Sequence, residues 1–182
     1  RRAEQYARDH GIAVDALPRI TGWGHRTARM GLADKLAASR EQPYVFPEVR
    51  GAITDAFARA GIAGAADLDT IECHDCFTTT HYMAIDHFGI TPPGQSFQAI
   101  DDGRVLAGGS IPINPSGGLI GLGHPVGATG VRMVLDAARQ VTDRAGKTQV
   151  RGARRAQTLN IGGSATTTVS FALEGVTRRQ LS

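Results

Sequence analysis

The feature that most restricts the fold of this chain is a glycine-rich segment, residues 114–130, which leads directly into a helical pattern. It reads Asn-Pro-Ser-Gly-Gly-Leu-Ile-Gly-Leu-Gly-His-Pro-Val-Gly-Ala-Thr-Gly and contains six glycines, two prolines and one histidine. Glycine allows a backbone to bend tightly or to approach a ligand closely. His124 lies near the middle of the segment and is followed by Pro125. We therefore expect a loop that is shaped around another group, with a histidine held inside it.

Helical and extended patterns alternate along the rest of the chain. Residues 47–61 show apolar side chains at helical spacing, and Gly61 can end that helix. Strands that alternate with helices predict an α/β layered domain. The predicted helices cover residues 3–10, 47–61, 78–88 and 128–141, with weaker helical character at 31–39. The predicted strands cover residues 17–24, 68–73, 156–161 and 166–173, and the first of them runs into a glycine turn. Residues 91–112 are predicted to be a loop that could include a short hairpin at 101–103.

Length and composition allow one globular core, and we expect no nucleic-acid partner. The chain has 182 residues, of which 41% are hydrophobic. Its net charge of +3 is mildly basic, and the basic side chains are interpreted as a solvated face or as a surface that attracts a polyanion such as a coenzyme A nucleotide. No nucleic-acid-binding motif accompanies them. The cluster consists of Lys147, Arg151, Arg154 and Arg155, with Arg178 and Arg179 near the end.

The sequence also gives expectations about location. It contains no apolar run of the roughly 20 residues needed to cross a bilayer, and it does not open with a secretory signal. Cys73 and Cys76 are too close together to link distant parts of a fold, which favours a reducing compartment. We therefore expect a cytoplasmic protein without a membrane partner.

A second segment contains side chains that could take part in catalysis. It reads His74-Asp75-Cys76-Phe77 and lies between a predicted strand and a predicted helix. Catalytic groups are common in such turns, because a rigid strand end positions them. Cys73 and Cys76 also have the spacing of half a zinc site, but a structural site needs four ligands and no second cysteine pair exists. A redox Cys-x-x-Cys lacks its usual context here. We therefore predict no metal, and interpret Cys73 as a small buried hydrophobe.

Residues 114–130 resemble the second signature of the thiolases, whose pattern is Asn-x-x-Gly-Gly-x-Ile-x-x-Gly-His-Pro-x-Gly-x-Ser/Thr-Gly. Every fixed position of that pattern is present. A dinucleotide-binding reading of the same glycines is rejected, because no clear parallel strand precedes them at the right spacing. Most thiolases have Asn-Glu-Ala-Phe where this chain has His-Asp-Cys-Phe, a version that resembles the sterol-carrier-protein-type thiolases. The order of elements is also similar to the C-terminal half of a thiolase over almost the whole chain.

This resemblance implies a thiolase-like C-terminal half, with a mixed five-stranded sheet and helices on both faces. Residues 1–182 would then form one thiolase C-terminal domain. The chain begins with Arg1 inside a helical pattern, so we expect a fragment. The N-terminal half, with its nucleophilic cysteine and main dimer contacts, and the first strand of this half would precede it. The sheet would then lack a strand and have an unpaired inner edge, which is costly. A homo-oligomer formed through the N-terminal half is expected.

The resemblance further implies an acyltransferase that cleaves 3-oxoacyl-CoA by thiolysis or forms it by Claisen condensation. Coenzyme A and acetyl-CoA would be substrates, and no cofactor is expected. His124 would activate the nucleophilic thiol, and His74 with His124 would form one oxyanion hole. The backbone N–H of Gly162 would contribute to the other. Cys76 would move the α-proton, and Phe77 would line the pantetheine tunnel.

One position departs from ordinary thiolases. Asn160 stands where they have their acid/base cysteine, and an amide cannot exchange a proton near neutral pH. The sterol-carrier-type branch also lacks that cysteine, so Cys76 is the expected replacement. The alternative for each of these side chains is a purely structural role.

Two alternatives for the whole chain remain open. A catalytically silent scaffold or an acyl-CoA- or lipid-binding subunit would fit Asn160. A thiolase-fold aldol lyase that trims steroid side chains would have tyrosine in place of His124 and Cys76, and this chain keeps both residues.

Overall fold

The computed structural model describes residues 1–175, so Arg178 and Arg179 lie outside the described part. The strands are β1 (Arg19–Thr27), β2 (Thr70–Cys73), β3 (Arg155–Gly162) and β4 (Thr167–Glu174). The helices are α1 (Arg2–Asp9), α2 (Leu32–Ser39), α3 (Pro47–Ala60), α4 (Thr78–Phe88), α5 (Ser96–Asp101), α6 (Gly118–Leu122) and α7 (Thr129–Val141), with single 3-10 turns at Val14–Ala16, Ala65–Asp67 and Gly146–Thr148. No helix among these residues is long and apolar enough to cross a membrane.

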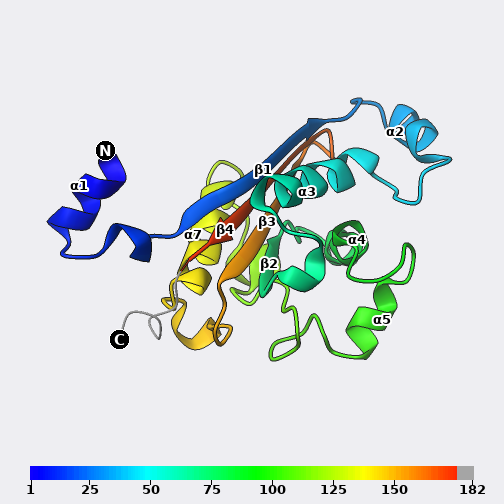
Figure 1. Cartoon of the computed structure of the whole chain (residues 1–182). Coiled ribbons are helices and arrows are strands. Elements are labelled where there is room, and N and C mark those ends of the chain that lie inside the picture. The colour runs from blue at the N-terminus through cyan, green and yellow to red at the C-terminus, as the bar shows by residue number, and fades with distance from the viewer. Residues whose placement is uncertain (176–182) are drawn as a thin grey trace.

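The α/β class predicted from the sequence is confirmed. The sheet has the strand order β1-β4-β3-β2, in which β4 is antiparallel to both of its neighbours and β3 is parallel to β2. Helices cover both faces, with α3 and α4 on one side and α7 on the other (Figure 1). Buried side chains of α3 and α4 share one apolar cluster with Ile71, Leu159 and Ala172, while α7 packs on Ala156 and Leu173.

The described sheet has four strands rather than the predicted five. Beside β2, residues 112–114 form only an isolated bridge, in which the Ile71 N–H donates to the Pro112 carbonyl at 3.1 Å and the Asn114 N–H donates to the Ile71 carbonyl at 2.7 Å. Proline has no N–H to donate, so Pro112 ends the pairing on one side of the bridge, and on the other side Asn114 leaves the extended conformation with a φ of 53°. Because β3 and β4 are paired on both sides, the two edges of the described sheet are β1 and β2.

Two glycines of β1 determine how α3 lies on the sheet. The sequence predicted a strand that runs into a glycine turn, but the structure keeps Gly22 and Gly24 inside a strand that continues to Thr27. A Cβ at Gly24 would lie 1.9 Å from the Ala52 carbonyl oxygen, and one at Gly22 would lie 2.1 Å from that of Ala56. These glycines are therefore required for the close contact of α3 with β1.

Helices predicted from local signals agree well with the structure. Helix α4 has the predicted bounds and ends at Gly89, which adopts a left-handed conformation. Helix α3 likewise ends at a left-handed Gly61. The predicted loop 91–112 is wrong in part, since it contains α5 instead of a hairpin. The glycine-rich segment also contains a short helix, α6, that its composition did not predict.

Candidate active site

The end of β2 and the glycine-rich segment are joined by a set of buried polar contacts. Asn114 accepts a hydrogen bond from the Cys73 N–H on its Oδ1 at 2.6 Å. Asn114 itself adopts a left-handed backbone with φ of 53°, a conformation that asparagine tolerates better than most residues. The first residue of the glycine-rich segment is thereby fixed to the sheet.

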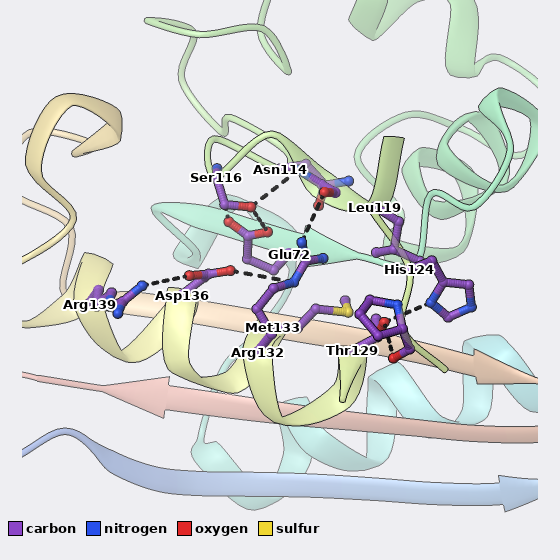
Figure 2. Close-up of polar contacts among 12 residues, drawn as sticks. Glu72, Asn114, Ser116, Leu119, His124, Thr129, Arg132, Met133, Asp136 and Arg139 are labelled. Carbon is purple, nitrogen blue, oxygen red and sulfur yellow. Dashed lines mark hydrogen bonds and ion pairs between the residues drawn. The ribbon is translucent and has the colours of Figure 1, made fainter. Parts of the chain in front are cut away.

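Glu72 makes the second contact. Its side chain is 1% exposed and accepts hydrogen bonds from the Ser116 hydroxyl at 2.7 Å and from the Ser116 N–H at 3.3 Å. Burial raises the pKa of Glu72 to about 7, against the partial opposition of these hydrogen bonds. Figure 2 shows Glu72, Arg132 and Asp136 gathered between β2 and α7. Arg132 also donates to the Gly118 carbonyl at 3.2 Å, so α7 holds the segment as well.

Asp75 makes the third contact. Its Oδ1 accepts a hydrogen bond from the Leu119 N–H at 2.6 Å, at the start of α6. The neighbouring Gly118 has a φ of 62°, and a Cβ there would lie 2.2 Å from the Asp75 Oδ2. Only glycine fits beside this carboxylate. The tetrad and the glycine-rich segment, 44 residues apart in sequence, therefore form one structural unit.

Two histidines meet at this unit. The rings of His74 and His124 lie 4.8 Å apart between centroids, in an edge-to-face arrangement of 89°. The His74 N–H donates to the Leu159 carbonyl of β3, which fixes this residue to the sheet. Burial lowers the pKa of His74, the nearby His124 lowers it further, and Asp75 acts in the opposite direction. His74 is 9% exposed, and its Nδ1 has no hydrogen-bond partner within the described part of the chain.

The predicted site residues line two hollows that share His74 and Ile161. The first, of about 300 Å³, is largely apolar and includes Cys76 and Phe77. The second, of about 360 Å³, is lined by His124, Asn160 and Gly162 among others. His74 belongs to both. The structure therefore brings the other four predicted site residues around His74, but it places Cys76 and His124 in adjacent hollows rather than in one.

The two cysteines have different surroundings. Cys73 is buried, and burial raises the pKa of its thiol well above the ordinary value. Cys76 is half-buried, with its Sγ 3.9 Å from the Thr80 Oγ1. Phe77 is 70% exposed at the mouth of the apolar hollow. Among residues 1–175, no three His, Cys, Asp or Glu side chains are grouped in a way that could hold a metal ion.

Sequence reasoning missed the residues that hold the site together. Asn114, Glu72 and Thr129 were not singled out, although a glutamate inside a strand that is otherwise apolar or neutral was an available signal. Asn160 packs toward α7, since its Nδ2 lies 3.0 Å from the Met133 Sδ. Its amide therefore occupies the wall of the second hollow beside α7.

Comparison with known proteins places this geometry in a family. The model of the thiolase C-terminal domain-like family matches residues 31–175. An acetyl-CoA acetyltransferase from Methanothermobacter thermautotrophicus is 43% identical over 98 residues, which cover 54% of this chain and 26% of that protein. Sterol carrier protein 2 from Rattus norvegicus is 32% identical over 173 residues, which cover 92% of this chain and 30% of that protein.

Solved structures show the same fold. An Ltp2-ChsH2(DUF35) aldolase superposes with a TM-score of 0.71 at 19% identity, over 87% of this chain and 39% of that chain. A monomeric SCP2-thiolase like protein type 1 from Mycobacterium smegmatis superposes with a TM-score of 0.63 at 17% identity, over 94% of this chain and 32% of that chain. The chain thus spans less than a third of the length of the two curated relatives named above. By its sequence match, its fold and its glycine-rich segment, it belongs to the thiolase C-terminal domain-like family.

Proposed function

We propose that this chain is the C-terminal catalytic half of a thiolase-type acyltransferase that cleaves or forms 3-oxoacyl-CoA. The observation that carries the proposal is the placement of His74 and His124 with ring centroids 4.8 Å apart, at a hollow that Gly162 also lines. The two imidazoles suit the stabilisation of one negative oxygen that develops during acyl transfer, and the backbone N–H of Gly162 suits that of a second. Family membership supports the same reaction class.

His124 acts as the base in this proposal. It takes the proton of a nucleophilic cysteine that the N-terminal half of the enzyme supplies. In cleavage the thiolate attacks the 3-oxo carbon, the bond between that carbon and the α-carbon breaks, and the α-carbon of the departing acetyl-CoA takes a proton from Cys76. The imidazolium formed has N–H groups on both ring nitrogens and can donate to an oxyanion. Burial lowers the pKa of His74, so His74 is neutral near pH 7 and contributes one N–H donor. The N–H of Gly162 serves the other oxyanion hole.

Cys76 moves the α-proton of the substrate. It is half-buried beside the apolar hollow, next to His74, whereas the amide of Asn160 cannot exchange a proton near neutral pH. Phe77 at the hollow's mouth contacts the pantetheine arm. The proposal also includes acyl-CoA as the substrate and no further cofactor. The complete enzyme would be a homo-oligomer in the cytoplasm.

The test is a thiolysis assay of the complete protein with an acyl-CoA substrate. His124→Ala and His74→Ala should each lower kcat by about 100-fold or more, the usual cost of one oxyanion donor, and Cys76→Ala should abolish α-proton exchange. Cys73→Ala is the matched control, because that thiol is buried and lines neither hollow. Unchanged turnover in both His124→Ala and Cys76→Ala would refute the proposal.

A second candidate is a binding subunit without chemistry. Two observations favour this candidate. Asn160 stands in place of the ordinary acid/base cysteine, and the hollow next to Cys76 is largely apolar. Such a protein would bind acyl-CoA with the same affinity in wild type and in Cys76→Ala, and would turn over neither thiolysis nor condensation substrates. Isothermal titration beside the thiolysis assay separates the two candidates.

A further inference from the structure

A threonine at the start of α7 contacts the imidazole of His124. The Nδ1 of His124 lies 2.7 Å from the Thr129 Oγ1, and that hydroxyl lies 3.1 Å from the Pro125 carbonyl oxygen, to which it donates (Figure 2). Thr129 is 2% exposed. Its hydroxyl is therefore shielded from solvent and must satisfy its hydrogen bonds with these two neighbours.

The proton of the hydroxyl decides which tautomer His124 adopts. A hydroxyl has one proton to donate, and a carbonyl oxygen can only accept. If Thr129 donates to Pro125, its oxygen is free to accept from Nδ1–H, and both contacts are hydrogen bonds. If it donates instead to a bare Nδ1, the contact with the Pro125 carbonyl places two oxygens 3.1 Å apart with no proton between them. The first arrangement makes one more hydrogen bond and is favoured.

We propose that Thr129 is a positioning residue that fixes His124 in the Nδ1–H tautomer. The consequence is that Nε2, on the far side of the ring, carries a lone pair and can accept a proton. A protonated imidazole donates from both nitrogens, so the contact with Thr129 survives when Nε2 takes the proton. The value of this for catalysis rests on the proposed function, but the tautomer itself does not.

The backbone of α7 makes the arrangement rigid. The Pro125 carbonyl also accepts the N–H of Ala128 at 2.8 Å and that of Thr129 at 3.0 Å. The turn that joins His124 to the helix is therefore closed by the same carbonyl that receives the hydroxyl proton. A serine at position 129 would keep the hydroxyl, whereas a valine would keep the shape and remove it.

The test is a direct measurement of the tautomer. Protein labelled with 15N-histidine is studied by long-range proton–nitrogen NMR correlation, at a pH where the imidazole is neutral, and the His124 signals are assigned by their loss in His124→Asn. Wild type and Thr129→Ser should show a protonated Nδ1 and a bare Nε2. Thr129→Val should shift His124 toward the Nε2–H form that free histidine prefers. A wild-type spectrum with a protonated Nε2 would overturn the inference, and so would a Thr129→Val spectrum that matches wild type.

Kinetics separate this inference from the proposed function. In the complete enzyme, Thr129→Val should lower kcat about tenfold, equivalent to about 1.4 kcal/mol, with KM unchanged and with recovery in Thr129→Ser. If the tautomer shifts in Thr129→Val while kcat does not, the positioning inference holds and the base role of His124 fails. If Thr129→Val does not fold, the wild-type and Thr129→Ser spectra still decide the tautomer.

Discussion

Replacement of Gly118 by alanine should destabilise the domain more than any other single methyl group added to the glycine-rich segment. The new Cβ would lie 2.2 Å and 2.6 Å from the two carboxylate oxygens of Asp75, in a residue whose φ is 62°. The left-handed backbone costs alanine about 1 kcal/mol. Displacement of the buried carboxylate from the Leu119 N–H costs a further 2 to 3 kcal/mol, roughly, because the bond is charge-assisted and its donor is left unpaired.

The expected loss is therefore about 3 to 4 kcal/mol, a large share of the roughly 5 to 15 kcal/mol that stabilises a typical domain. Urea unfolding followed by circular dichroism measures it. Gly121→Ala is the matched control, since it lies in the same short helix, its φ is not positive and its Cβ would meet nothing within 4 Å. That variant should stay within about 1 kcal/mol of wild type, on the stabilising side.

The same substitution in an Asp75→Ala protein separates the steric clash with the carboxylate from the cost of the backbone conformation. In Asp75→Ala protein the carboxylate is gone, so Gly118→Ala should cost only the backbone term of about 1 kcal/mol. The difference between the two costs is the coupling between these residues. Equal costs with and without the carboxylate would refute the reasoning, as would a Gly118→Ala protein as stable as Gly121→Ala.

Three further predictions rest on titration and reactivity. The folded-state pKa of Glu72 is raised to about 7 from an ordinary 4.5. The free energy of unfolding should therefore fall as pH rises through that interval, by about 3 kcal/mol at most. Glu72→Gln should flatten the slope of unfolding free energy against pH, and an unchanged slope would contradict the assignment. The pKa of His87 is lowered, mainly by burial, and its Nε2 accepts the Phe46 N–H at 3.1 Å. Stability should therefore fall as pH drops below the ordinary 6.5, less steeply in His87→Asn, and the same urea titrations would show it. Iodoacetamide should label the half-buried Cys76 in the folded protein and spare Cys73, with peptide mass spectrometry as the measurement; equal labelling would disprove the difference in access.

The helices could be predicted because their signals are local. Helix α4 follows from an uninterrupted run between Phe77 and Gly89, and α3 from its apolar spacing and its terminal glycine. The alternation of these helices with apolar strands was enough to identify the α/β class. Family membership followed from one contiguous motif, which needs no knowledge of the fold.

Pairing and side-chain direction could not be predicted in the same way. The position of residues 112–114 beside β2 depends on contacts made across some 40 residues of chain, and nothing local distinguishes a bridge from a strand. The separation of Cys76 and His124 into adjacent hollows depends on how the turn after β2 leaves the sheet, where strand periodicity no longer applies. The hydrogen-bond partners of Glu72 and Asp75 could not be predicted either, because they lie 44 residues away in the sequence.

The contacts of β2 explain why the positions of the two motifs depend on each other. His74 is held to β3 through its own N–H, so its position is set by the sheet. The ring of His124 contacts the Thr129 hydroxyl of α7 instead of the sheet, and the place of the segment that carries it also depends on the contacts of Glu72, Cys73 and Asp75. A substitution that weakens one of those contacts moves one ring relative to the other while the sheet stays intact. Loss of activity should therefore precede loss of fold in Glu72→Gln, because the distance between two rings is more sensitive to the segment's position than the buried core is.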